Sequence, residues 1–413
     1  MKTRRRFSVV VCALAAGLGL LAPPLARAQE KPAAAPAQEP KPSMTIYGFA
    51  MLDFGANFKS ISPDWYDTMR ITKLPSYTDQ YGKDGSWFAG VRQTRFGVKT
   101  ATTAGGNDLT AKFEIDMFGT GGDAGQTTIR LRQAWGEWGA LGAGQTDSPF
   151  EDENLWPNTV EYWGPTGMVF FRNVQVRWTP VKGDHTLMLA LERPGASGDA
   201  GVLADRIELQ NVKGRFPLPD FTGAYKYGQP WGYARVGWAL REIKWDDLLA
   251  DKYELSGRAT GWGLNFSSSL NLGKKDVLRL AVVYGKGIQN YMQDSPVDIG
   301  VARNPGNAVT PVVGKPLPIL GTLIFLDHTW NDRFTSSVGY SSQDNDNTDG
   351  QAPNAFKAGS YALGNLLYTP VPNMLIGGEF QWGRRENFSD GWTYDDYKIQ
   401  FVFKYSFSHK LGG

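Results

Sequence analysis

Hydrophobic and polar residues alternate along most of this chain, with the period of two that a β-strand gives. In the segment before the C-terminus, every second side chain is aromatic or aliphatic: Tyr397, Ile399, Phe401, Phe403, Tyr405 and Phe407. The positions between them are mostly polar: Lys398, Gln400, Lys404 and Ser406, with Val402 as the exception. This pattern predicts a strand with one apolar face and one hydrated face.

Segments with this alternation follow one another from Met44 onward, and we count sixteen. They cover residues 44–58, 87–100, 108–118, 127–138, 140–147, 172–179, 185–193, 220–228, 233–244, 258–271, 276–286, 318–330, 333–343, 358–369, 374–386 and 394–407. Their mean length suits a tilted strand that crosses a bilayer.

The connections between these segments alternate between short and long. Residues that favour tight turns occupy 181–184, 229–232, 272–275, 331–332 and 370–373. Long connections fall at about 59–86, 148–171, 194–219 and 287–317. An even number of strands then puts both termini at the short-turn end, as in a bacterial outer-membrane barrel. The alternative, a soluble β-sandwich, would leave two sheet edges to cover and has no reason to sort its loops in this way.

The predicted fold class is therefore all-β. We expect a transmembrane antiparallel β-barrel of about 16 strands over residues 44–407, with short periplasmic turns and long extracellular loops. Residues 408–413 would form a C-terminal tail beyond the last strand.

The first 28 residues have the three parts of a secretory signal peptide. Lys2 and three arginines precede an uncharged, mostly apolar run over 7–22, and Ala26 and Ala28 fit a cleavage site. A membrane anchor is the alternative, but the run is short for one. Residues 29–43 are rich in Pro and Ala and cannot bury a core, so we expect a disordered periplasmic leader or, alternatively, a spacer for a periplasmic partner.

Composition excludes several classes of function. One Cys and three His cannot supply a disulfide framework or a Cys-based metal site, and we expect no metal or other cofactor. The formal net charge of +2 gives no indication of nucleic-acid binding. An outer-membrane hydrolase would need a nucleophile beside a histidine, and neither His185 nor His328 has a recognisable Ser partner, so we do not expect an enzyme.

The free-energy cost of placing a charged side chain in lipid decides which face of each strand meets the lipid. Arg or Lys facing lipid at the membrane midplane costs about 2–4 kcal/mol, so the polar face must line the interior. A barrel of about 16 strands is too wide for side chains to fill, and its interior therefore holds water. The inward-facing basic residues are then Arg95, Lys99, Lys112, Arg130, Arg132, Arg177, Arg235, Arg241, Arg279, Arg333 and Arg385.

Arginine predominates in this set, and its planar fork suits carboxylate or phosphate groups. Arg130 and Arg132 would stand about 7 Å apart on one face. Our candidates for pore-lining and solute-binding residues are Arg95, Arg130, Arg132, Arg177, Arg235, Arg279, Asp53, Glu114, Asp116 and Glu379. Alternatively, these arginines pair with the four acids and only hold the wall together.

The connection at 148–171 is rich in acidic and aromatic residues. It contains Glu151, Asp152, Glu153, Trp156, Glu161, Tyr162, Trp163, Phe170 and Phe171. If it folds into the barrel, it narrows the pore and sets an acidic surface opposite the arginines, which would orient a charged solute. Alternatively, 148–171 is an ordinary surface loop, although the apolar residues in this connection argue against its full exposure to water.

Several stretches resemble those of a known family in order and spacing. They are Gln93–Lys99, Lys112–Phe118, Leu131–Trp138 with Ala143–Asp147, Gly164–Gly167 with Arg172–Trp178, and Gly378–Glu386. Through them the chain resembles Gram-negative porins, and more narrowly the DcaP-like porin family, over essentially all of 44–407. The chain departs from the family pattern at two points. Family members can carry a helical N-terminal extension, whereas here only the Pro- and Ala-rich stretch 29–43 is present. Porins also commonly end on the aromatic residue of the last strand, whereas this chain runs past Phe407.

The resemblance implies a homotrimeric sixteen-stranded channel in the outer membrane, surrounded by lipid and lipopolysaccharide, with its third long loop constricting the pore. It also implies small, negatively charged solutes such as dicarboxylates or aromatic acids. A general or sugar-type diffusion channel without anion preference remains the alternative, because an aromatic ladder in the lumen would favour sugars where an arginine ladder favours anions.

Overall fold

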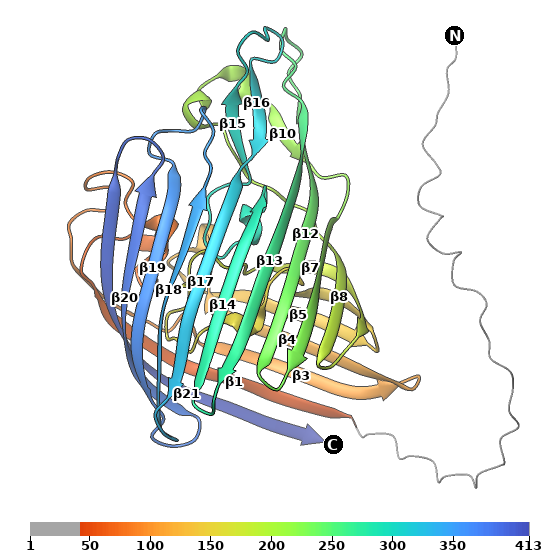
Figure 1. The fold of residues 1–413 in the computed structure, drawn as a ribbon, viewed down its shortest axis with the longest axis vertical. Helices are drawn as coiled ribbons and strands as arrows, with labels where there is room; N and C mark the ends of the chain where they lie inside the picture. Colours follow the sequence, from red (N-terminus) through yellow and green to blue (C-terminus); the bar gives the residue numbers. More distant parts are fainter. Residues whose placement is uncertain (1–41, 413) are drawn as a thin grey trace, which may run out of the picture. The chain divides into compact units, whose positions relative to one another are not determined.

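The alternating segments pair into one closed antiparallel sheet in a computed structural model, which describes residues 42–412 (Figure 1). The predicted signal peptide and nearly all of the predicted leader lie outside the described residues. The strands of this sheet are β1 (Ser43–Asn57), β2 (Ser86–Gly90), β3 (Arg95–Ala104), β4 (Asn107–Phe118), β5 (Thr127–Trp138), β6 (Leu141–Asp147), β7 (Arg172–Val181), β8 (His185–Glu192), β10 (Val212–Arg215), β11 (Asp220–Gln229), β12 (Gly232–Asp247), β13 (Gly257–Leu272), β14 (Asp276–Lys286), β17 (Pro318–Thr329), β18 (Phe334–Asn345), β19 (Phe356–Tyr368), β20 (Met374–Asn387) and β21 (Thr393–Gly412).

These eighteen strands occupy sixteen positions around the wall. Both β2 and β3 pair with β1, one with its second half and one with its first half, so together they form a single interrupted strand. In the same way, β10 and β11 pair with successive parts of β12. The predicted number of strands is confirmed.

The first and last strands close the barrel. β1 pairs with β21 from Ser43 opposite Gly412 to Asn57 opposite Lys398. Residues 408–412 are therefore part of the wall, and the prediction that they form a tail beyond the last strand is wrong. Their pairing with β1 covers backbone groups that a free tail would leave open, and closure leaves no sheet edge.

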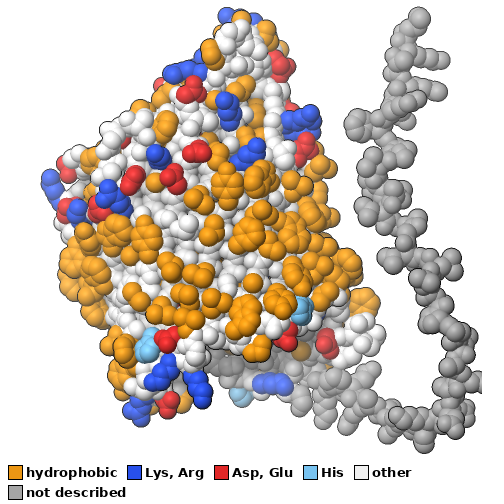
Figure 2. Space-filling view, in the orientation of Figure 1, with side chains coloured by type: hydrophobic (Ala, Val, Ile, Leu, Met, Phe, Trp, Pro, Cys, Tyr) orange, Lys and Arg blue, Asp and Glu red, His pale blue; other side chains and the backbone are white. Residues whose placement is uncertain are grey.

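Burial confirms the predicted facing of the strands. Inner side chains such as Asp53 and Gln400 are at most 2% exposed, whereas the outer Val176 and Val338 are 60% and 57% exposed. Figure 2 shows the outer side chains as a broad hydrophobic belt, with charged groups gathered toward the two ends. This distribution is the inverse of a water-soluble protein and suits a wall in contact with lipid.

Short elements and a second sheet occupy the long connections. β9 (Gly198–Asp199), β15 (Ile299–Arg303) and β16 (Val312–Pro316) form a small three-stranded sheet at the long-loop end (Figure 1). The 3₁₀ helices are η1 (Pro63–Trp65), η2 (Ile71–Lys73), η3 (Gly121–Asp123), η4 (Glu153–Leu155), η5 (Gly201–Leu203), η6 (Ile207–Leu209) and η7 (Gln289–Tyr291). In residues 42–412, no helix is long and apolar enough to cross a membrane.

The apolar core lies inside the barrel, between the wall and the loops. One cluster joins Ile71 and Leu155 of two different loops to Phe325 and Tyr361 of the wall. Another packs Phe150 and Tyr291 from two loops against Val283 of β14. The loops thus bury apolar side chains inward and cannot stand free above the barrel.

Candidate functional site

The connection between β6 and β7, residues 148–171, lies against the inner wall. Asp152 accepts hydrogen bonds from Tyr233 Oη on β12 at 2.8 Å and from Ser267 Oγ on β13 at 2.6 Å. Further on, the Asn158 N–H donates to Asp327 of β17 at 3.1 Å. The segment therefore crosses the interior from β6 toward the opposite wall.

The far end of this crossing is held by Glu379 on β20. Its carboxylate accepts the backbone N–H of Val160 at 3.0 Å and that of Glu161 at 3.1 Å. Glu161 in turn forms an ion pair with Lys398 of β21 at 3.0 Å, and both of these side chains are fully buried. Hydrogen bonds to charged groups are the stronger kind, so this end of the loop is firmly fixed.

The acids of the loop do not form one exposed surface. Glu151, Asp152 and Glu161 are at most 4% exposed, and only Glu153 is open to solvent. Burial, together with the nearby Asp147, raises the pKa of Glu151 well above its usual range. Trp156 packs edge-on against Phe170 within the same loop, with ring centroids 5.1 Å apart.

The predicted arginines fall into two groups by partner. Arg130 and Arg132 both bind Asp116, at 2.6 and 3.0 Å, and Arg132 also binds Glu114 at 2.7 Å. Both guanidinium groups also contact the Tyr162 hydroxyl of the loop. These two arginines thus pair with wall acids, as in the alternative that the sequence left open.

The other arginines hold the loop or neighbouring wall groups. Arg235 donates to the backbone carbonyls of Pro149 and Glu151. Arg279 donates to the carbonyl of Asn154 and also pairs with a carboxylate of β17 at 2.8 Å. Arg177 donates to Gln175 and to the backbone carbonyl at the end of β6.

Arg95 and Asp53 complete the predicted set. Arg95 Nη1 lies 3.8 Å from Glu114, a looser ion pair than those of Arg130 and Arg132. Asp53 accepts hydrogen bonds from the side-chain amides of Gln93 and Gln400 at 3.0 and 2.9 Å, and no arginine pairs with it among the described residues. The structure therefore brings Glu114 and Asp116 together with three of the predicted arginines and leaves Asp53 and Glu379 apart from them.

Two further segments fold inward, and of these 58–85 was not predicted from the sequence. The connection 58–85 contacts the loop 148–171, where the Met69 N–H donates to Glu161 at 3.1 Å. It also reaches the connection after β14, where Arg70 pairs with Asp294 at 2.8 Å. Apolar residues inside 58–85, such as Trp65 and Leu74, are the signal that could have indicated this, because they argue against an exposed loop just as the aromatics of 148–171 do.

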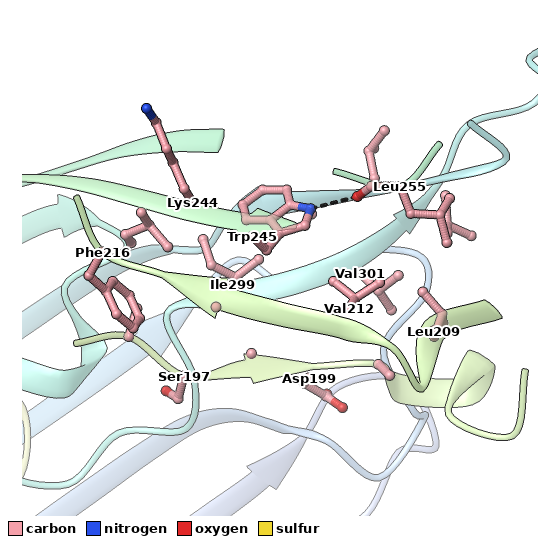
Figure 3. Close-up of a pocket in the computed structure, with 18 residues that line it drawn as sticks. Ser197, Asp199, Leu209, Val212, Phe216, Lys244, Trp245, Leu255, Ile299 and Val301 are labelled. Carbon is pink, nitrogen blue, oxygen red and sulfur yellow. Dashed lines mark hydrogen bonds between the residues drawn. The ribbon is translucent and has the colours of Figure 1, made fainter. Parts of the chain in front are cut away.

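A separate cavity of about 310 Å³ lies among the strands at the long-loop end (Figure 3). Its lining is mostly apolar, with Leu209, Val212, Phe216 and Ile243 among the side chains. The Trp245 indole at its wall donates to the Leu255 carbonyl at 2.9 Å. This cavity offers few partners to a charged solute, and the arginines and acids described above do not line it.

A closed sixteen-stranded barrel with an apolar outer belt, a polar inner wall and inward-folded loops is the architecture of a bacterial outer-membrane channel of the porin class. The chain belongs to the DcaP outer membrane protein family, whose model matches residues 50–407. A comparison with curated proteins found no match.

Solved structures with the same fold include several porins. The outer membrane channel DcaP of Acinetobacter baumannii is 23% identical, with a TM-score of 0.71, over 88% of this chain and 97% of that one. An anion-selective porin from Comamonas acidovorans is 10% identical, with a TM-score of 0.58, over 89% and 100%. A trimer form of OmpT from Vibrio cholerae is 11% identical, with a TM-score of 0.53, over 89% and 99%. At these identities the likeness establishes the fold.

Proposed function

We propose that this outer-membrane channel passes small anionic solutes, such as dicarboxylates or aromatic acids, by passive diffusion. The observation that carries the proposal is an excess of positive charge on accessible parts of the inner wall. Four cations face inward near the short-turn end: Arg95, Lys99, Lys112 and Lys404. Among the described residues, the acid that forms ion pairs with members of this set is Glu114, which contacts Arg95 and Lys112. A lumen lined by one sign of charge concentrates the opposite ion.

The narrowing of the channel is assigned to the loop 148–171, supported by the inward segments 58–85 and 287–298. Hydrogen bonds to β12, β17 and β20 and an ion pair with β21 hold the loop 148–171 across the interior. A barrel of this width otherwise leaves a wide aqueous path that selects little between solutes. Glu151, Asp152, Glu153, Trp156 and Glu161 belong to this constriction in our proposal, although most of them act by fixing the loop.

We further infer a homotrimer in the outer membrane of a Gram-negative bacterium, surrounded by lipid and lipopolysaccharide. Residues 1–28 would direct its export and then be cleaved. The exposed apolar belt supports a lipid environment. A trimer form among the structurally similar porins supports the oligomer.

The reversal potential of the purified channel in a planar bilayer with a KCl gradient tests the anion preference. We expect a potential of the sign that chloride permeation gives. A potential near zero, or one of the opposite sign, would instead favour the general or sugar-type channel. Native mass measurement in mild detergent tests the trimer, and a monomer alone would contradict it.

A further inference from the structure

Basic side chains also gather on the outer face of the wall, above the apolar belt at the long-loop end (Figure 2). Lys244 of β12 is one of them. Its neighbour Ile243 is 3% exposed and faces the interior, and successive side chains of a strand point to opposite faces. Figure 3 shows the Lys244 side chain directed away from the cavity beside Phe216 and Ile299. Residues paired with Lys244 on the neighbouring strands share this outward face.

Three outward cations form one row across three neighbouring strands. Arg215 of β10 is directly opposite Lys244, and Lys244 is directly opposite Arg258 of β13. Directly opposed like charges destabilise a sheet. An anionic group that lies over the row would remove this repulsion, so the row indicates a partner of negative charge.

Acids of the wall neutralise this row only in part. Arg215 pairs with Asp246, with Nη2 at 2.9 Å from a carboxylate oxygen, and Lys244 pairs with Glu242 at 3.0 Å. The Arg258 side chain is exposed and has no hydrogen bond or ion pair among the described residues. Its guanidinium group therefore keeps its hydrogen-bonding capacity for a ligand.

A fourth cation, Lys286, marks the boundary between this row and the apolar belt. It is the last residue of β14, lies opposite Trp262 of β13, and like Arg258 has no ion pair in the described part of the chain. Tyr284 is two residues along β14 and is 52% exposed. Aromatic side chains concentrate at the membrane interface. Arg258 is four residues beyond Trp262, about 13 Å along the strand, so the cations stand at and just above the level of lipid headgroups.

The surface below these cations is apolar and exposed. Leu240 and Leu264 are 51% and 37% exposed, and Leu240 lies opposite Trp262. A ligand that contacts both levels needs acyl chains below a negatively charged headgroup, which a free anion lacks. Arginine and lysine bind phosphate through charge-assisted hydrogen bonds. Basic clusters at the edge of a membrane-spanning region bind lipid headgroups in this way.

We propose that Arg215, Lys244, Arg258 and Lys286 form a headgroup site for a phosphorylated glycolipid of the outer leaflet, whose acyl chains lie against the apolar belt of β12–β14. This inference rests on the proposed function, because it needs the barrel to stand in an outer membrane with its long loops outward. The site is on the outer face, so it holds a lipid beside the channel and takes no part in the solute path.

Native mass measurement of lipid adducts on the purified channel in mild detergent tests this site. The probe is lipid A that carries two phosphates, and the matched control is the same lipid after both phosphates are removed. For the wild type we expect saturable binding of the phosphorylated lipid at concentrations at which the dephosphorylated lipid binds little. Arg258→Gln/Lys286→Gln should raise the dissociation constant about tenfold, because each cation near the lipid phosphates strengthens binding.

Matched variants separate a specific effect from a general one. Arg258→Lys/Lys286→Arg keeps both charges and should bind the lipid nearly as tightly as the wild type. Lys274→Gln/Lys275→Gln removes two charges from the turn after β13 and should leave binding unchanged. Inorganic phosphate in large excess should not displace the lipid, because the acyl chains contribute to its binding. Retained heat-dependent mobility in gel electrophoresis shows that each barrel is folded.

Three results would overturn the site. They are equal binding of the two lipids by the wild type, equal binding of the phosphorylated lipid by the wild type and Arg258→Gln/Lys286→Gln, and displacement of the lipid by inorganic phosphate. The reversal potential in KCl separates this inference from the proposed function. It should be the same in Arg258→Gln/Lys286→Gln and the wild type, because both side chains lie outside the lumen, and a wild type without anion preference would overturn the proposed solutes alone.

Discussion

Glu379 holds the far end of the inward loop 148–171 through two backbone groups, and Glu379→Ala should release this end. The change removes the carboxylate that accepts the N–H groups of Val160 and Glu161 at 3.0 and 3.1 Å. A hydrogen bond to a charged group contributes about 1.5–3 kcal/mol, so the two together contribute about 3–6 kcal/mol. Glu379→Ala also removes the free-energy cost of burying this carboxylate, which offsets part of the loss. We therefore use the lower value, about 3 kcal/mol.

A loss of about 3 kcal/mol raises the population of a released loop roughly 150-fold. The Glu161–Lys398 pair remains, so we expect intermittent release instead of a permanently open pore. In single-channel recordings, Glu379→Ala should show larger and noisier current than the wild type. Glu379→Gln, which keeps an acceptor oxygen, should lie between the two.

Gln381→Ala is the matched control for this experiment. Gln381 lies two residues along β20 and is also fully buried. Its amide donates to Glu379 at 2.8 Å and to Gln400 at 3.2 Å, and among the described residues it makes no hydrogen bond to the loop. Its replacement should leave the current level and noise close to those of the wild type. Equal conductance and noise in Glu379→Ala and the wild type would refute the reasoning, because the loop would then not narrow the conducting path.

Three further predictions concern the charges around the loops. Arg130→Ala/Arg132→Ala leaves Asp116 without an ion-pair partner among the described residues and Glu114 with only its looser contacts to Arg95 and Lys112. Anion preference in the reversal potential should therefore fall, and the free energy of unfolding should drop by about 3 kcal/mol or more, seen as a lower heat-induced unfolding midpoint; an unchanged potential would show that these arginines only hold the wall. Burial raises the pKa of Glu151, so its folded form holds a proton more tightly than its unfolded form. Wild-type stability should therefore fall as pH rises from the usual carboxyl pKa through the raised one, and the gain of Glu151→Gln over wild type, measured as urea midpoints at pH 4 and pH 8, should grow with pH; a gain independent of pH would contradict this. Arg70→Ala breaks the ion pair with Asp294, one of the contacts that join two inward segments, and leaves the hydrogen bonds from Thr72 to Asp294. Hydrogen exchange of the amides in 66–74 should therefore accelerate while that of wall amides stays constant; equal acceleration in the wall would indicate general destabilisation.

The wall was predictable because lipid imposes a simple rule on it. Every second residue of β21 up to Phe407 is apolar, and that alternation alone marks the strand and its outer face. The rule ends where lipid contact ends. Residues 408–412 lack the apolar alternation, so their pairing with β1 could not be predicted from it.

The inner contacts were less predictable because they join residues that are distant in the sequence. That Arg132 would meet Glu114 depends on the register of β4 and β5, which contains an irregularity at Glu114. That Glu161 would pair with Lys398 depends on the path of a loop across the whole interior. Alternation shows that such groups face inward, but it carries no information about which of them meet.

The pairing of β1 with β21 also constrains the order in which this barrel can assemble. Its fifteen opposed residue pairs join the two ends of the described chain. Contacts of such long sequence separation form late, because the loop-closure entropy must be overcome first. Until then two strand edges stay open to other chains. Lys404 of β21 meets the Phe49 ring of β1, which Arg95 of β3 also contacts, only when this seam forms, so that shared contact would be acquired in the final step of assembly and would report that the barrel has closed.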